Sequence, residues 1–418
     1  MKYSTFLQDR GFVHQFTAPT LAEILDGEPR VVYHGIDPSA DSAHAGNFVI
    51  WMLLRHLADA GHTIIFLVGG GTGMIGDPKP NAERTLLTPE VIAHNVAKIK
   101  TQAEKIIGAG KMNIQFVDNA EWLCSENLIT FLRDVGKHFT VNELIKKDAI
   151  ATRLSGDTGI SYTEFAYPLL QGYDYLTLYK RYGCTLQVGG SDQWGNIVAG
   201  VDLIRRKEQA SVHAVTVPLV IDKATGKKFG KSEGNAVWLD GDKTSPFAFY
   251  QFWLQVSDES VIDLLKLFTF YSNEEINTIK EAWLEDVSKR HAQERLALAV
   301  TSTIHGDSTA LAIANVSKVL FSNSDIQTLS DDEMQLLLQN APQVECIDGE
   351  EVVDVLVRSG LASSKREART FIESGAITMQ NTKLNSVSDT VSALNGLCQL
   401  LKRGKKQLVV VKILEKKI

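Results

Sequence analysis

The first half of the chain alternates between short stretches rich in β-branched residues and longer stretches whose apolar residues follow helical spacing. Strand-like stretches lie at 30–36, 62–70, 113–117, 184–190 and 212–220, and helical stretches lie at 47–61, 88–108 and 191–206. Alternation of this kind predicts an α/β fold in which helices cover a parallel sheet. Residues 120–183 resemble helical insertions between strands, and residues 244–340 are mostly helical in pattern.

Glycine-rich and polar clusters stand at the ends of three of these strands: YHGIDP, VGGGTGMIGDP and QVGGSDQWGN. Ligands of open parallel sheets bind outside the carboxyl ends of the strands. We therefore expect a ligand site at this edge of the sheet, and the coincidence of three clusters weighs more than any one of them.

Two short motifs suit the phosphates of a nucleotide. HAGN (44–47) opens a helix, whose first N–H groups favour phosphate, and His44 and Asn47 share one face of its first turn. KKFGKSEGN (227–235) is rich in glycine and supplies lysine and serine donors for a triphosphate. Each motif alone has an ordinary alternative: a helix cap with a solvated histidine, and a basic surface hairpin.

Together, the two motifs resemble the motif pair of class I aminoacyl-tRNA synthetases. Longer stretches, in order along essentially the whole chain, look like bacterial tyrosyl-tRNA synthetase: YHGIDPSADSAHAGN, LVGGGTGMIGDP, FLRDVGKHFTVNELI, SYTEFAYPLLQGYDY, LQVGGSDQWGNI, TVPLV and KFGKSEGNAVWL. The resemblance implies a tyrosine–tRNA ligase. The tyrosine carboxylate would attack the α-phosphorus of ATP, giving tyrosyl-adenylate and pyrophosphate, and tyrosine would then pass to the 3′-terminal adenosine of its tRNA. Mg²⁺ would accompany the triphosphate, with no tightly held protein metal site.

The resemblance also implies the domain organisation. Residues 1–222 would form a Rossmann-like catalytic domain with a helical insertion around 120–183. Residues 223–325 would hold the KFGKS loop and an α-helical domain that binds the anticodon stem, and 326–346 would be a linker. Residues 347–418 would form a small α+β RNA-binding domain similar to one in a ribosomal small-subunit protein.

By resemblance, Tyr33 would hydrogen-bond the phenol of the tyrosine substrate, and Asp174 would take the phenol's proton. A ligand without the hydroxyl would leave both groups unpaired in a dry pocket, which is a physical way to reject phenylalanine. The ordinary alternatives are a satisfied core tyrosine and a helix-surface acid.

The other end of the tyrosine substrate has its own implied partners. Tyr167, Gln171 and Asp77 would hold its ammonium group, and Gln193 would face its carboxylate or the ribose of ATP. Tyr167, Gln171 and Asp174 are spaced i, i+4 and i+7, which places them on one helical face, although an ordinary half-buried stripe has the same spacing.

The resemblance assigns the remaining site residues to ATP. Its adenosine and ribose would lie against Gly35, Asp37, Gly190 and Asp192. Its phosphates would be bound in the transition state by His44, Asn47 and Ser39, and the departing pyrophosphate by Lys228, Lys231 and Ser232. No protein base is needed, because the attacking carboxylate is already ionised, so catalysis would consist of positioning and charge stabilisation.

The sequence departs from the family pattern in three places. Alanine and Asn47 replace the commonest residues of the first motif, and Ser39 stands where threonine is common but keeps the hydroxyl. DPKPNAER is one residue shorter than usual. Lys79 and Arg84, which resemble basic residues near the triphosphate, are therefore left without an assigned place.

The C-terminal part of the chain is basic. Residues 356–418 hold twelve Lys/Arg and four Asp/Glu, a net charge of +8, which leaves −15 for the preceding residues because the whole chain carries −7. This asymmetry suggests a polyanionic partner for the tail, although a solvated basic surface would look the same. The resemblance makes that partner the tRNA, bound through Lys365, Arg366, Arg369, Lys402, Arg403, Lys405 and Lys406.

Composition adds the setting. No stretch offers about 20 uninterrupted apolar residues, so we expect no membrane association. The N-terminus lacks the apolar segment of a signal peptide, and the four cysteines are far apart, which favours a reduced, cytoplasmic protein. The family is usually a homodimer, with the insertion around 120–150 as its interface.

Three alternatives stay open beside an active tyrosine enzyme. The sister tryptophanyl enzyme is disfavoured by Tyr33 with Asp174 and by the basic tail. A catalytically inactive synthetase-like RNA-binding protein is disfavoured by the intact KFGKS, His44, Asp77 and Gln193. Another nucleotidylyltransferase would lack both the tyrosine pocket and the RNA-binding domain.

Overall fold

The structure is a computed structural model that describes residues 2–78, 83–108, 113–156, 159–223, 226, 228–232, 235–321, 324–393, 396–404 and 407–414. The chain forms two compact units. Unit 1 comprises Met1–Ser245 and Phe252–Leu296, and unit 2 comprises Pro246–Gln251 and Ala297–Ile418. Along the chain, the division between the units falls within helices α12 (Pro246–Leu254) and α15 (His291–His305).

A six-stranded sheet forms the core of unit 1, in the order β1-β6-β5-β2-β3-β4. Its strands are β1 (Gln15–Phe16), β2 (Val31–Ile36), β3 (Thr63–Val68), β4 (Ile114–Asp118), β5 (Cys184–Gly190) and β6 (His213–Val217). All neighbours are parallel except β1, which runs antiparallel to β6. The predicted parallel sheet is confirmed.

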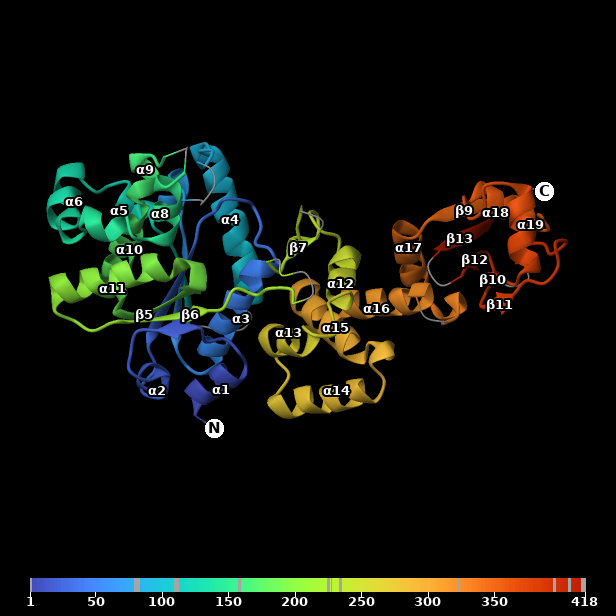
Figure 1. The fold of residues 1–418 in the computed structure, drawn as a ribbon, viewed down its shortest axis with the longest axis horizontal. Helices are drawn as coiled ribbons and strands as arrows, with labels where there is room; N and C mark the ends of the chain where they lie inside the picture. Colours follow the sequence, from blue (N-terminus) through green and yellow to red (C-terminus); the bar gives the residue numbers. More distant parts are fainter. Residues whose placement is uncertain are drawn as a thin grey trace. The chain divides into compact units, whose positions relative to one another are not determined.

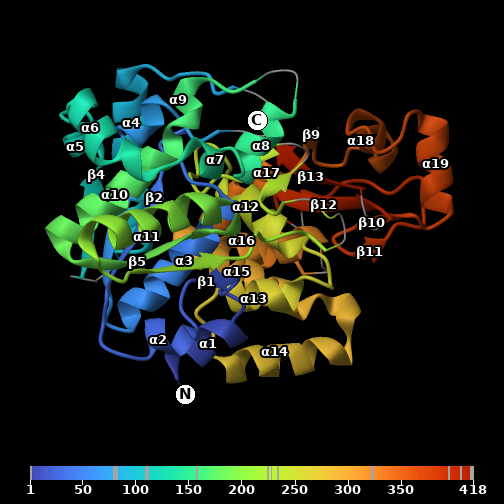
Figure 2. The same cartoon turned by 60° about the vertical axis from the view of Figure 1, so that its left-hand side comes forward.

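Two pairs of helices cover this sheet on opposite faces (Figures 1 and 2). Helices α3 (Ala45–Asp59) and α4 (Pro89–Ile106) connect β2 to β3 and β3 to β4. Helix α10 (Tyr167–Tyr182) leads into β5, and α11 (Trp194–Glu208) connects β5 to β6. Because such crossovers are right-handed, the reversal of strand order at β2 and β5 places the two pairs on different faces.

Residues 120–182 are helical, as the sequence suggested, and they hold α5 (Ala120–Leu123), α6 (Leu128–Asp134), α7 (Val141–Leu144), α8 (Asp148–Leu154) and α9 (Tyr162–Phe165) before α10. Residues 3–25 form α1 (Tyr3–Asp9), β1 and α2 (Leu21–Leu25). The fully buried Arg10 follows α1 and donates to the carbonyls of Thr269 and Tyr271, which tie the N-terminus to the end of α13.

The later part of unit 1 contains the short hairpin of β7 (Lys231–Ser232) and β8 (Asn235–Ala236), and helices α13 (Val261–Phe268) and α14 (Asn273–Glu285). Helix α13 packs against α3. Phe48 of α3 stacks on Phe268 of α13, with ring centroids 5.7 Å apart. The helix that begins at His44 is therefore fixed from both sides, by the sheet and by α13.

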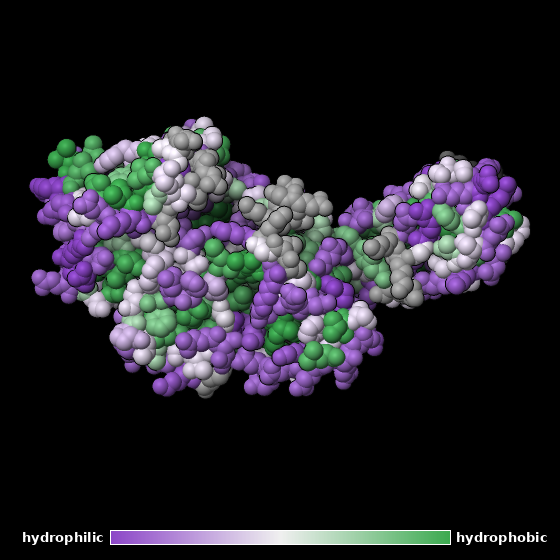
Figure 3. All heavy atoms as spheres, in the orientation of Figure 1, coloured by the Kyte–Doolittle hydropathy of each residue, from purple (hydrophilic) through white to green (hydrophobic). Residues whose placement is uncertain are grey.

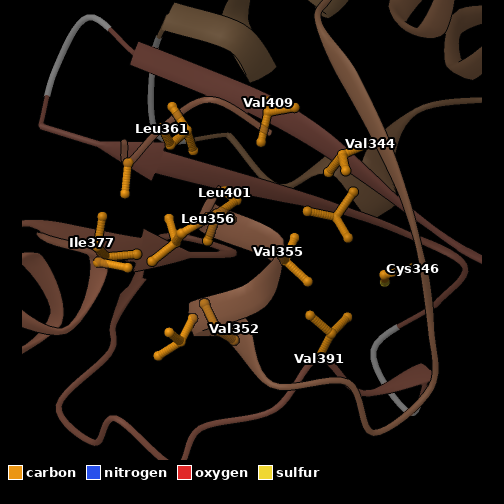
Figure 4. Close-up of a cluster of buried hydrophobic side chains, with 14 of the residues drawn as sticks. Val344, Cys346, Val352, Val355, Leu356, Leu361, Ile377, Val391, Leu401 and Val409 are labelled. Atoms are coloured by element: carbon orange, nitrogen blue, oxygen red, sulfur yellow. The ribbon is translucent and has the colours of Figure 1, made fainter. Parts of the chain in front are cut away.

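Unit 2 continues with α16 (Asp307–Phe321), α17 (Asp331–Asn340), α18 (Val352–Arg358) and α19 (Lys365–Glu373). A second sheet has the order β11-β10-β12-β13-β9, with β9 (Gln343–Ile347), β10 (Ile377–Met379), β11 (Thr382–Lys383), β12 (Cys398–Arg403) and β13 (Gln407–Leu414). Aliphatic side chains from both helices and strands fill its core, as Figure 4 shows for Val355, Leu356, Leu401 and Val409.

The stretch 326–346, suggested as a linker, contains α17 and most of β9. The reason is burial: Leu337 of α17 packs with Leu400 and Val410 of the second sheet, and β9 pairs with β13 in parallel. A capping box in which Ser330 and Glu333 satisfy each other's backbone N–H groups fixes the start of α17.

Candidate active site

The point where the strand order reverses, between β2 and β5, brings two of the predicted clusters together. Tyr33 of β2 and Gln187 of β5 are direct neighbours across the two strands. Beyond β2 the chain continues to Asp37 and His44, and beyond β5 it continues to Asp192 and Gln193. Open sheets of this type bind their ligands at this crevice.

Asp174 is buried at the centre of a polar network. Its carboxylate accepts hydrogen bonds from Asn119 Nδ2 at 2.9 Å and from Trp122 Nε1 at 2.7 Å. Burial raises its pKa to about 7 despite these two donors. Tyr33 is only 1% exposed, and burial together with the nearby Asp174 charge raises the pKa of its phenol. The structure thus brings together the donor and acceptor expected around the substrate phenol.

Asn119 and Trp122 were not singled out from the sequence. Asn119 Nδ2 also donates to Thr72 Oγ1, and its Oδ1 accepts from Gly71 N at 2.8 Å, so it joins the glycine-rich turn after β3 to Asp174. Their position in the sequence could have indicated them. Residues 118–122 (DNAEW) directly follow the strand expected at 113–117, at the same edge of the sheet as the other polar clusters.

The expected ammonium-binding residues lie around two half-buried carboxylates, those of Asp37 and Asp77. Tyr167 donates from its hydroxyl to Asp37 Oδ2 at 2.9 Å, and Thr72 Oγ1 donates to Asp37 Oδ1 at 2.7 Å. Burial raises the pKa of Asp37 to about 6. Gln171 is half-buried one turn along α10 from Tyr167.

Asp77 receives hydrogen bonds from Gln193 Nε2 and Asn196 Nδ2, each at 3.0 Å. Burial raises the pKa of its carboxyl. The Asp77 charge also raises the pKa of Asp37, and the Asp37 charge raises the pKa of Asp174. The two carboxyl groups of Asp37 and Asp77, close enough for their charges to interact, favour a cationic group, which suits the ammonium of an amino acid.

His44 is the N-cap of α3. Its Nδ1 accepts from Gly46 N at 3.0 Å, while its own backbone N–H donates to Asn47 Oδ1 at 3.2 Å. In the neutral imidazole the proton is therefore on Nε2. These capping contacts orient both side chains at a helix N-terminus, where N–H groups favour anions.

The KFGKS segment runs beside this N-terminus. Ala45 N donates to Val237 O at 2.8 Å, and His44 and Trp238 form an antiparallel bridge. Phe229 is buried against Phe252, Trp253 and Phe268. The segment is therefore anchored at both ends next to the HAGN motif.

The residues predicted to bind ATP lie at the ends of two strands, β2 and β5. Gly35 and Ser39 are exposed at the end of β2. A Cβ atom on Gly190 would lie 2.7 Å from Asp192 Oδ1, so the Asp192 side chain lies directly against this glycine. Lys228 Nζ lies 3.4 Å from Asp192 Oδ2, an exposed ion pair that joins a predicted pyrophosphate ligand to a predicted ribose ligand.

Some expected residues fall outside what the structure describes. Lys231 and Ser232 lie in β7 without described side chains, and Lys79 is not described. Arg84 is described: its Nε donates to the Asp77 carbonyl at 2.8 Å. A cavity of about 560 Å³ adjoins Asp77 and Asp192 and extends between α11 and the helical insertion.

The predicted RNA-binding residues lie in unit 2. Lys365, Arg366 and Arg369 are exposed on α19 and are named the basic α19 face below. Arg403 is half-buried, stacks over Phe371 at 4.6 Å and donates to the Leu361 carbonyl at 2.6 Å, so it also supports the fold. Burial lowers the pKa of Lys402. Lys405 and Lys406 lie outside the described residues.

Among the described residues, no three His, Cys, Asp or Glu side chains gather in a way that could hold a metal ion. Within the same residues, no helix has the length and apolar character needed to cross a bilayer. The cysteines, all four of which are described, are free thiols.

Two family models match the chain. One, described as tRNA synthetases class I (W and Y), covers residues 25–322, and the other, described as the tyrosine–tRNA ligase SYY-like C-terminal domain, covers residues 333–411. The fold and the family are accordingly those of a class I aminoacyl-tRNA synthetase, as the sequence predicted.

Curated relatives narrow the family. The tyrosine–tRNA ligase of Leifsonia xyli subsp. xyli is 45% identical, over 96% of this chain and 92% of that protein. The tyrosine–tRNA ligase of Chromobacterium violaceum is also 45% identical, over 98% and 99%. A C-terminally truncated mitochondrial tyrosyl-tRNA synthetase of Aspergillus nidulans superposes with a TM-score of 0.69 at 30% identity, covering 77% of this chain and 94% of that one. The chain belongs to the tyrosine–tRNA ligase family.

Proposed function

We propose that this chain activates tyrosine with ATP and transfers it to tRNA. The observation that carries the proposal is the buried pair of Tyr33 and Asp174, with Asp174 held by Asn119 and Trp122. A carboxylate fixed by two donors can accept from a phenol, and a ligand without the hydroxyl would leave it unpaired. The curated relatives are named as ligases, which favours catalysis over the inactive RNA-binding alternative.

In the first step, an oxygen of the tyrosine carboxylate forms a bond to the α-phosphorus of ATP while the bond to the pyrophosphate oxygen breaks. MgATP is the second substrate. Tyr167, Gln171 and Asp77 hold the ammonium group, Gln193 faces the carboxylate or ribose, and the turn of Gly190 and Asp192 lies against the nucleoside. The half-buried carboxylates of Asp37 and Asp77 attract the ammonium and leave the substrate carboxylate directed toward the phosphates.

Charge that develops on the phosphates is stabilised by the N-terminus of α3, by His44 and Asn47, and by Lys228, Lys231 and Ser232 of the KFGKS segment. A helix N-terminus with an oriented imidazole donor is already in place before the reaction, so little reorganisation is needed. The exposed Lys228–Asp192 pair can separate at small cost when phosphate competes for the lysine.

In the second step a ribose hydroxyl of the 3′-terminal adenosine of tRNA forms an ester bond to the tyrosyl carbonyl carbon, while the bond from that carbon to the phosphate oxygen breaks and AMP leaves. The basic α19 face supports RNA binding, because its three cations are exposed on one helix. Arg403, Lys402, Lys405 and Lys406 complete the proposed surface. We place the protein in the cytoplasm, where its free thiols would stay reduced.

The proposed homodimer uses the helical insertion. Apolar side chains gather on the surface over α6 (Figure 3), where Leu128 is 67% and Ile129 70% exposed, and Val141 of α7 is 62% exposed. A cluster of this kind is unusual on a monomer. Light scattering should give a molar mass twice that of one chain. The double substitution Leu128→Asp with Ile129→Asp should reduce the measured mass to that of a single chain. A single-chain mass for the unaltered protein would contradict the dimer.

The test of the function is charging of bacterial tRNA with labelled tyrosine. The account predicts ATP-dependent, acid-precipitable label that tyrosine competes away and tryptophan does not. Exchange of pyrophosphate without any charging would restrict the protein to the first step, and the absence of both would favour the non-catalytic alternative.

A further inference from the structure

An ion pair between Arg153 of α8 and Glu164 of α9 is enclosed within unit 1. Arg153 Nη1 lies 2.9 Å from Glu164 Oε2, and the two side chains are 1% and 2% exposed. Removing two charges from water costs free energy that their attraction only partly returns, so such a pair is a weak source of stability on its own. Its presence at this position therefore points to another role.

The contacts of Glu164 lead toward the proposed tyrosine pocket. Its Oε1 accepts from the backbone N–H of Arg84 at 3.1 Å. The Arg84 side chain donates from Nε to the Asp77 carbonyl at 2.8 Å. The Asp77 carboxylate in turn meets Gln193 and Asn196. An unbroken series of contacts therefore runs from the buried ion pair to a proposed ligand of the ammonium group.

The same pair also stands at the entrance to α10. Helix α9 is capped by Ser161, whose Oγ accepts from Glu164 N at 3.3 Å, and it ends two residues before Tyr167. Arg153 Nε donates to the Gly159 carbonyl at 2.8 Å. The ion pair thus joins three segments: α8, the chain that enters α10, and the residues that follow Asp77.

We propose that Glu164 and Arg153 are positioning residues that hold Asp77 and Tyr167 at the separation required by the substrate ammonium group. The inference rests on the proposed function, in which Asp77 and Tyr167 bind that group. Neither member of the ion pair reaches the substrate. Both act by fixing the backbone at Arg84 and at the start of α10, because a pocket that is correctly spaced before binding loses less affinity to reorganisation.

The test measures tyrosine-dependent pyrophosphate exchange at saturating MgATP for Glu164→Gln, which keeps the shape and removes the charge. The tyrosine KM should rise about tenfold while kcat changes less than about threefold and the ATP KM stays unchanged. Equilibrium dialysis with labelled tyrosine should show the same loss without turnover. Arg153→Lys keeps the positive charge but loses the hydrogen bond to the Gly159 carbonyl. It should therefore raise the tyrosine KM less than Glu164→Gln does.

A matched control is Arg10→Met, which removes another fully buried arginine of unit 1 whose partners are carbonyls. It should lower the melting temperature and leave the tyrosine KM unchanged. Arg84→Ala cuts the series at a half-exposed side chain, so it should fold even where the buried variants do not, and it should raise the tyrosine KM.

The proposal is overturned when the folded variants among Glu164→Gln, Arg153→Lys and Arg84→Ala keep the tyrosine KM within about twofold of the unaltered protein. The ion pair would then be structural, like Arg10. Failure of the proposed function would look different. In that case the unaltered protein would catalyse no tyrosine-dependent pyrophosphate exchange and would bind no tyrosine in dialysis.

Discussion

Gly230 of the KFGKS motif lies against Gly46 of the HAGN motif. A Cβ atom on Gly230 would be 2.7 Å from the backbone nitrogen of Gly46, and Gly230 has a φ of +89°. Both the close approach and the backbone conformation require glycine. The relationship joins two segments far apart in the sequence at the helix end where we propose that phosphates bind.

Gly230→Ala should therefore impair the chemical step. We expect kcat for tyrosine-dependent pyrophosphate exchange to fall at least about tenfold, because a displaced KFGKS segment cannot reach the phosphates, while tyrosine binding in dialysis is unchanged. The matched control is Gly226→Ala, at φ +67° with nothing within 4 Å of its Cβ, which should lower stability slightly and leave kcat near normal. Equal effects of the two changes would refute this role for the contact.

Tyr33→Phe should reduce discrimination between tyrosine and phenylalanine. Loss of one hydrogen bond to the substrate phenol should lower kcat/KM for tyrosine about tenfold and leave kcat/KM for phenylalanine unchanged or higher. Tyr175→Phe is the control, since its ring centroid lies 5.4 Å from that of Tyr33 but its hydroxyl donates to the His213 carbonyl at 2.8 Å. Discrimination that survives Tyr33→Phe would place the phenol elsewhere.

Tyrosine use should depend on the protonation of Asp174. Burial raises its pKa to about 7, and its protonated form can no longer serve as a charged acceptor for the phenol. As the pH falls below this pKa, kcat/KM for tyrosine should drop about tenfold per pH unit. Trp122→Phe removes a donor to the carboxylate, so the pKa should rise and the decline should begin at higher pH. If kcat/KM for tyrosine did not change with pH around 7, Asp174 would not be the acceptor of the phenol. A pH dependence that Trp122→Phe does not shift would contradict the same role.

The basic α19 face should affect only the tRNA step. Arg366→Glu with Arg369→Glu should leave pyrophosphate exchange unchanged and weaken charging strongly, with a reduced dependence on salt, because fewer counterions are released on binding. Lys98→Glu with Lys105→Glu on α4 makes the same change of charge in unit 1 and should leave charging near normal. Comparable losses in both variants would indicate a general effect of charge.

A truncation after residue 345 would not test the tRNA step alone, because the cut lies inside β9. Such a cut would pass through β9, remove β13, with which β9 pairs in parallel, and expose Leu337 by removing Leu400 and Val410. Substitutions on α19 avoid this damage because the three cations are exposed.

Much of the fold could be predicted because its signals are local. The strands β2, β3 and β5 are short β-branched runs ended by glycine or polar residues, and α3 has helical spacing and an N-cap residue, His44. By contrast, β1 has two residues and pairs with β6, almost two hundred residues later, so periodicity cannot reveal it.

The site shows the same division. Tyr33, Asp174 and His44 stand in long stretches shared with a family, so the resemblance located them. Asn119 and Trp122 hold Asp174 through contacts between segments that no short motif records, and Glu164 belongs to a pair formed only when α8 and α9 pack together. Such partners of the primary residues follow from tertiary structure.

The most direct test of the account is amino-acid-dependent exchange of labelled pyrophosphate into ATP without tRNA, with tyrosine, phenylalanine and tryptophan compared in parallel. The account predicts exchange with tyrosine and none above background with the other two, since only tyrosine satisfies both Tyr33 and Asp174. A folded sample that catalyses no exchange with tyrosine, or that accepts phenylalanine equally well, would contradict it.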